Sequence, residues 1–309
     1  MERIVHGILF EGRRLPDAWD VSVWEANGHR EVSVRQAVQW VEMGVVPVLD
    51  WSNRPLGELD SELDADLIEE KRQQSLKKAA QRAQTMCRRI IKAEGFNELL
   101  TITYRDNQQD RELCKKHFKE WVRRMKAALG GEFRYCASFE RQDRGAMHVH
   151  VACHKLPQHA VRKGQKILGW RLGTTIWRSI VGADNGLVFV GGKPGAKGRR
   201  RAKMSAAKMA QYVSKYIMKD YAEAPEESNR YSRSNGAPMG VPMRLRLTGC
   251  DMADLIGAVF ECRDGDVVVS HRLGSFCDTY WLCTEPGPGQ RAGQAPGSYG
   301  CLRDAESVS

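Results

Sequence analysis

Phe133-Arg-Tyr-Cys-Ala-Ser-Phe-Glu140 is followed by the five residues Arg141-Gln-Asp-Arg-Gly145 and then by Ala146-Met-His-Val-His-Val-Ala-Cys153. Both outer segments alternate apolar and polar residues in the manner of strands, and the segment between them ends in glycine. We therefore predict a β-hairpin with strands at 133–140 and 146–153. If residues 141–145 close this hairpin, Glu140 pairs with Ala146, Ser138 with His148 and Cys136 with His150.

The hairpin lies within a longer series of predicted elements. These are a strand at 98–104, a helix at 110–129 ended by Gly130-Gly131, a helix at 167–180, a strand at 187–190 and a helix at 205–221. The order is typical of the split β-α-β arrangement in the α+β class. We predict a central antiparallel sheet of about five strands with flanking helices on one face, and with the strand at 146–153 in the centre.

The remaining chain predicts the domain boundaries. A basic helix at 59–93, with Gly95 as its C-cap, leads into this domain, which we place at 59–221. Residues 1–58 form an N-terminal segment of unknown role, with a strand at 5–10 and a short helix at 33–43. After a linker at 222–243 we expect a small α/β segment at 244–284 and a disordered tail at 285–309.

Composition indicates the kind of partner and compartment. The 309 residues carry a net charge of +10 with a pI near 9.2, which favours a polyanionic partner such as nucleic acid. An apolar run of membrane-spanning length is absent from the sequence, and so is a signal-peptide core at its start. Nine irregularly spaced cysteines without a Cys-x-x-Cys pair are typical of reduced thiols in a cytoplasm.

The second hairpin strand carries a candidate metal site. His148 and His150 alternate with apolar residues, so both imidazoles lie on one face of the strand. Glu140 reaches the same face in the predicted register. Two imidazoles and a carboxylate suit Mg²⁺ or Mn²⁺ bound together with substrate oxygens. The alternative is a half-buried histidine pair with a structural role.

The helix at 205–221 carries a repeated pattern in Gln211-Tyr-Val-Ser-Lys-Tyr-Ile-Met-Lys219. Tyr212 and Tyr216 are four residues apart and share one helical face, and each is followed after three residues by a lysine, Lys215 or Lys219. A phenol becomes a nucleophile when its target is polarised or its proton is removed. The alternative is an amphipathic helix with two half-buried tyrosines.

The loop before this helix holds the densest basic cluster of the sequence. We predict that it contacts the DNA backbone without reading sequence, although a solvated surface loop is the equal alternative. It also lacks the spacing of an ATP-binding P-loop. The basic residues are Lys193, Lys197, Arg199, Arg200, Arg201 and Lys203.

Together these segments resemble the HUH endonucleases, specifically the two-tyrosine rolling-circle replication initiators of phages and plasmids. The strand ending in Tyr104 resembles the family's first motif, residues 140–150 the second and residues 212–219 the third. The resemblance covers about residues 75–221. It implies that His148, His150 and Glu140 hold a divalent cation. It also implies that Tyr212 or Tyr216 nicks one DNA strand at an origin, leaving a 5′-phosphotyrosyl enzyme and a free 3′-OH.

The resemblance also implies partners and a place of action. Lys215 and Lys219 would hold phosphate oxygens or stabilise the phenolate, and both single-stranded and origin DNA would bind. A host helicase and polymerase would act with the protein in the bacterial cytoplasm, without a membrane. A relaxase or two-tyrosine transposase would use the same chemistry. A non-catalytic DNA-binding regulator and a basic RNA-binding protein are also compatible with the charge of the chain.

Overall fold

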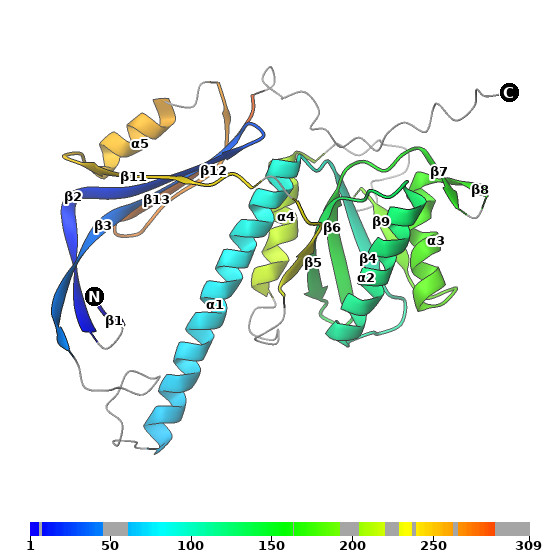
Figure 1. Ribbon diagram of the computed structural model, residues 1–309, viewed down its shortest axis with the longest axis horizontal. Coiled ribbons are helices and arrows are strands. Elements are labelled where there is room, and N and C mark those ends of the chain that lie inside the picture. The colour runs from blue at the N-terminus through cyan, green and yellow to red at the C-terminus, as the bar shows by residue number, and fades with distance from the viewer. Residues whose placement is uncertain are drawn as a thin grey trace. The chain divides into compact units, whose positions relative to one another are not determined.

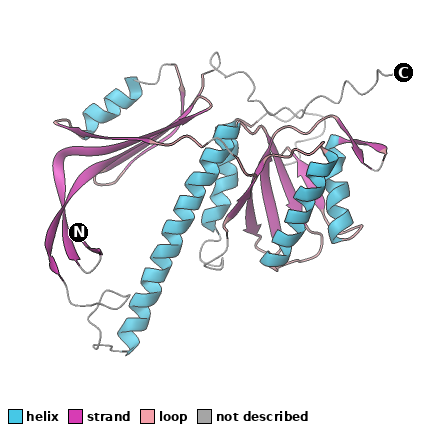
Figure 2. Ribbon diagram, in the orientation of Figure 1, coloured by secondary structure: helices cyan, strands magenta, loops and turns pink. Residues whose placement is uncertain are grey.

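The computed structural model describes residues 1–5, 8–45, 61–162, 164–191, 204–219, 229–236, 239–261 and 265–287. The chain divides into two compact units, one made of residues 1–75 and 240–291 and the other of residues 76–239 and 292–309 (Figure 1). Helices and antiparallel sheets are both present (Figure 2), which confirms the predicted α+β class. Among the described residues, no helix is long and apolar enough to cross a membrane.

The second unit contains the predicted antiparallel sheet. Its five strands lie in the order β10 (Tyr231–Arg233), β5 (Tyr135–Arg141), β6 (Met147–Cys153), β4 (Glu98–Thr103) and β9 (Leu187–Val190). Strand β6 is central and pairs with β5, as predicted. The short edge strand β10 was missed, because its three residues lie within the stretch predicted as a linker. A further hairpin is formed by β7 (His159–Arg162) and β8 (Gln165–Leu168).

Helices cover both faces of this sheet, so the prediction of helices on one face is wrong. Helices α2 (Arg111–Ala128) and α3 (Gly169–Val181) pack on the face that carries Phe139 and Val149. Helices α1 (Ser61–Glu94) and α4 (Ala206–Lys219) pack on the face that carries Cys136 and Ala152. The physical reason is that every residue of β6, and nearly every residue of β5, is buried. A sheet that is apolar on both faces needs cover on both.

Helix α2 follows from local sequence signals. Asp110 caps its N-terminus by accepting hydrogen bonds from the backbone of Glu112 and Leu113. The buried residues Phe118, Trp121 and Met125 then recur at helical spacing. Gly131 ends the helix in the left-handed region, with a φ of 100°.

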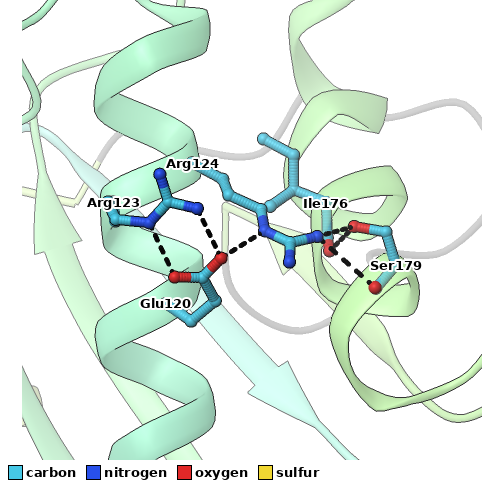
Figure 3. Close-up of polar contacts among 5 residues, drawn as sticks. All are labelled: Glu120, Arg123, Arg124, Ile176 and Ser179. Atoms are coloured by element: carbon cyan, nitrogen blue, oxygen red, sulfur yellow. Dashed lines mark hydrogen bonds and ion pairs between the residues drawn. The ribbon is translucent and has the colours of Figure 1, made fainter.

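A polar contact joins α2 to α3. Glu120 accepts hydrogen bonds from Arg123 and Arg124, and Arg124 donates in turn to the hydroxyl of Ser179 on α3 at 2.9 Å (Figure 3). Ser179 also donates to the carbonyl of Ile176 at 2.6 Å. The contact is partly exposed, so we assign it a role in aligning the two helices rather than a large share of stability.

The first unit is a six-stranded sheet made from both ends of the chain. Its strands are β1 (Glu2–Val5), β2 (Ile8–Ala26), β3 (His29–Val45), β11 (Met243–Thr248), β12 (Val267–Leu273) and β13 (Thr279–Glu285), and helix α5 (Met252–Glu261) packs against it. Strand β13 pairs with β3, and β11 pairs with β2. The segments predicted separately at 1–58 and 244–284 therefore belong to one sheet.

The short helix predicted at 33–43 is also wrong, because these residues lie in β3. Val32 and Val34 are buried, whereas Ser33 and Arg35 between them are more exposed. This alternation suits a strand whose backbone is paired on both sides, and β-branched valines fit it well. Pairing with β2 and β13 thus outweighs the weak helical pattern.

Candidate active site

The β5–β6 hairpin places the three predicted metal ligands on one face. Glu140 lies opposite His148, and Ser138 lies opposite His150. The predicted register was therefore wrong by two residues, because the strands extend further toward the turn. Gly145 adopts a φ of 89° and donates its backbone N–H to Gln142 at 2.7 Å. A shift of two residues preserves the face, so the common face of the three side chains is confirmed.

His150 contacts residues from both neighbouring strands. Its Nε2 lies 2.8 Å from Oε2 of Glu140 on β5, and its Nδ1 lies 3.4 Å from the hydroxyl of Thr101 on β4. His148 lies two residues away, with Thr103 opposite it on β4. His150 is thus held on both sides, which fixes the plane of its ring.

Helix α4 lies over this same face of the sheet. Met209, Val213 and Ile217 are buried at helical spacing, as predicted. Ser138 donates its hydroxyl hydrogen to the carbonyl of Val213 at 2.8 Å, in a buried contact between β5 and the helix. The chain segment with the tyrosines is therefore attached directly to the hairpin with the histidines.

Both tyrosines contact His150. The Tyr216 ring is stacked on it with 4.0 Å between centroids and an interplanar angle of 10°. The Tyr212 ring meets it edge-on at 5.6 Å, and the two phenol rings lie 5.3 Å apart. Tyr216 is only 7% exposed, whereas Tyr212 is partly exposed. Tyr212 is consequently the phenol that solvent reaches more readily.

The two lysines of the repeat make different contacts. Lys219 donates to Oε1 of Glu140 at 3.0 Å and lies 3.7 Å from Asp143 in the hairpin turn. The ammonium of Lys215 lies 4.6 Å from the ring centroid of Tyr212 and 4.8 Å from that of Tyr216, which is cation–π geometry. Lys219 therefore faces the acidic side of the cluster and Lys215 faces the phenols.

Electrostatics reflect this crowding of buried groups. Burial alone would raise the pKa of Glu140, but hydrogen bonds from His150 and Lys219 outweigh it and keep that pKa below its usual value. Burial, with His150 nearby, lowers the pKa of His148 to about 4. Burial and a hydrogen bond with Tyr212 raise the pKa of Tyr216. His148 is thus neutral and Tyr216 protonated at neutral pH.

The donor set has the chemistry of a divalent-cation site. Neutral imidazole and ionised carboxylate are the forms in which these side chains bind metals, and His148, His150 and Glu140 share one face. Within the described residues, however, no three His, Cys, Asp or Glu side chains are grouped around a common point. Glu140 is directed instead to His150 and Lys219. The residues fit a cation in type and face, and the metal site stays a prediction.

Three further polar residues of this cluster were not predicted from the sequence. Thr101 and Ser138 project to the histidine face of the neighbouring strands, and Asp143 lies in the turn. The period-two pattern could have indicated the first two once the pairing was known. The basic loop predicted to bind DNA, at residues 193–203, lies outside the described residues, as does the predicted tail beyond residue 287.

The buried Ser138 hydroxyl gives a testable contribution to stability. We expect Ser138→Ala to lower the free energy of unfolding by about 1 kcal/mol, because it removes a buried hydrogen bond between β5 and α4. Urea unfolding measures this. Ser214→Ala is the matched control, since Ser214 is equally buried but bonds a carbonyl of its own helix, that of Gln211. Equal losses in the two variants would contradict a specific role for Ser138.

Comparison with protein families identifies a similarity that covers this unit. Residues 97–221 match a family described as replication-associated protein ORF2. The match begins just before β4 and extends past α4, so it includes the hairpin and the tyrosine helix. Comparison with curated proteins and with solved structures gave no match. Residues 97–221 are thus similar to replication-associated proteins, which supports a role in DNA replication and contact with DNA.

Proposed function

We propose that the protein initiates rolling-circle replication by nicking one DNA strand through a tyrosine nucleophile. The observation that carries this proposal is the convergence of Tyr212 and Tyr216 on His150, beside Glu140 and Lys219. These residues come from three separate elements, β5, β6 and α4. A structural core would not need two phenols, a carboxylate and two cations at one place, because buried polar groups cost stability. The similarity to replication-associated proteins points the same way.

Tyr212 is the better candidate for the first attack. It is the more exposed of the two phenols, and Lys215 lies against its ring. Its oxygen would attack phosphorus, the 3′-oxygen of the scissile bond would leave, and a 5′-phosphotyrosyl bond would form. The phenolic proton must be lost in this step, and the cation of Lys215 favours the developing negative charge.

Tyr216 would serve a second strand transfer. Its higher pKa keeps it protonated and inactive while it is stacked on His150. After one round of synthesis the regenerated origin would need a second nucleophile, because Tyr212 would still carry the 5′ end. Movement of the Tyr216 ring off His150 would expose that hydroxyl. In this way the pair would rejoin ends at termination without releasing them.

His148, His150 and Glu140 would hold Mg²⁺ or Mn²⁺. Such an ion supplies Lewis-acid polarisation of the scissile phosphate. Lys219 holds Glu140 in its ionised form, and Thr101 orients the ring of His150. Contact of the basic loop with the DNA backbone, and recruitment of a host helicase and polymerase, belong to the same proposal.

The direct test is covalent capture of DNA. The full-length protein is incubated with a labelled single-stranded oligonucleotide from its own replicon's origin and with Mn²⁺, and the products are separated under denaturing conditions. We expect a labelled protein–DNA adduct and a free 3′-OH that a polymerase extends. Binding without an adduct would instead indicate the non-catalytic regulator.

A further inference from the structure

The sheet of the first unit has two chemically different faces. Helix α5 lies over one of them (Figure 1), where Val21, Val34 and Leu282 pack with Met252 and Leu255. Successive side chains of a strand alternate between faces, so the residues between these apolar ones project to the other face. We call this other face of strands β2, β3, β11, β12 and β13 the open face.

The open face contains a groove of about 670 Å³. This volume lies in the range of small-ligand sites. Its polar lining comes from three neighbouring strands and combines guanidinium groups, hydroxyls and a carboxylate. The residues are Asp20, Ser22, Ser33, Arg35, Arg244 and Arg246.

Most of the positive charge in this groove is not neutralised by neighbours. Arg246 forms a two-pronged ion pair with Asp20, with N–O distances of 2.7 and 3.1 Å. Arg35 and Arg244 are exposed and have no carboxylate partner in the part of the chain that the structure describes. The groove therefore carries an excess of two positive charges beside hydroxyl donors, which suits an anionic group such as phosphate.

Protection of sheet edges does not account for this pattern. Charged side chains on edge strands prevent association with other sheets, and β11 is an edge strand. Arg35, however, lies on β3, which is paired on both sides with β2 and β13. An exposed arginine in the middle of the sheet points to a ligand.

A row of residues extends the groove across the sheet. The strand register places these side chains side by side on the open face, in the order Arg244, Ser22, Ser33, Trp281 and Arg272. Trp281 lies between Tyr280 and Leu282, which both belong to the α5 side, and it is partly exposed. With adjacent strands about 4.8 Å apart, the row spans about 19 Å.

We propose that the open face is a second binding surface for single-stranded DNA. Arg35 and Arg244 bind backbone phosphates in the groove, and Trp281 stacks on a base. Arginines that follow the backbone beside an aromatic stacking platform are the general means of binding single strands without sequence preference. The choice of DNA as the anion rests on the proposed function, whereas the surface belongs to a different unit from the candidate active site.

The test measures binding of the full-length chain to fluorescein-labelled oligo-dT in EDTA, so that cleavage plays no part. We expect Arg35→Gln/Arg244→Gln to raise Kd about tenfold or more and to reduce the slope of log K against log salt by about 1.4. Lys116→Gln/Lys126→Gln removes the same charge from the exposed side of α2 and is the matched control. The control should change Kd less than about threefold.

Trp281 gives an independent readout. We expect Trp281→Leu to weaken binding at least about fivefold with an unchanged salt slope, and Trp281→Phe to restore most of it. Circular dichroism melting checks that each variant is folded. The proposal is overturned if the arginine variant binds oligo-dT as the control does, if it loses only duplex binding, or if poly-glutamate binding weakens equally. Failure of the adduct assay would leave these binding results intact, so the two proposals fail separately.

Discussion

We expect Tyr212→Phe combined with Tyr216→Phe to form no covalent adduct with DNA. Phenylalanine keeps the ring contacts with His150 but lacks the oxygen that would attack phosphorus. The protein should therefore fold and bind DNA as before. Denaturing electrophoresis with a labelled oligonucleotide measures the adduct, and mass spectrometry of the phosphotyrosyl peptide identifies the attached residue.

The single variants distinguish the two tyrosines. Tyr212→Phe should slow the first cleavage about tenfold or more, which corresponds to a barrier higher by about 1.4 kcal/mol or more. Tyr216→Phe should slow it less, because this phenol is buried and its pKa is raised. Tyr216→Phe should instead impair rejoining over repeated rounds.

Tyr135→Phe controls for loss of a phenol outside the site. Its hydroxyl lies 3.0 Å from that of Ser232, and its ring packs on the opposite side of the sheet with Phe118. We expect normal nicking from this variant. An adduct in the double variant, or wild-type adducts that map only to Tyr216, would contradict the proposed division of labour.

The second large effect concerns the three predicted metal ligands. His148→Ala, His150→Ala and Glu140→Gln should each lower the nicking rate on the order of 1,000-fold, because a bound cation contributes several kcal/mol of charge stabilisation. EDTA should have the same effect on the wild type, and Mn²⁺ or Mg²⁺ should reverse it. Oligonucleotide binding should change little, since affinity comes mainly from phosphate contacts.

A direct measurement of Mn²⁺ binding separates a metal role from a structural one. Titration calorimetry should show that the wild type binds Mn²⁺ and that Glu140→Gln, which keeps the shape of the side chain, binds it at least about tenfold more weakly. His159→Ala changes a histidine of the separate β7–β8 hairpin and should bind Mn²⁺ normally. Equal loss of stability and of DNA binding in the ligand variants would show that these residues are structural.

Local periodicity was sufficient to predict the elements that carry the site. The alternation around His148 and His150 depends only on neighbouring residues, and it predicted the central strand and the face that the two rings share. The four-residue repeat likewise predicted one helix with both tyrosines on one side. Gly145 and Gly95 marked a turn and a helix end, because both adopt positive φ. The shared face of Glu140 did not depend on the predicted register being right, since a shift of two residues leaves every side chain on its own face.

Pairing between distant segments could not be predicted in this way. Strand β13 joins β3 across more than two hundred residues, and no local pattern specifies which strand a sheet edge accepts. The same holds for the hydrogen bond from Ser138 to Val213 and for the ion pair of Lys219 with Glu140, which exist only because α4 lies against β5. Local sequence therefore determined which residues face the same way along each element. The tertiary structure decided which of these faces meet, because burial of apolar surface and backbone pairing are satisfied by the whole chain together.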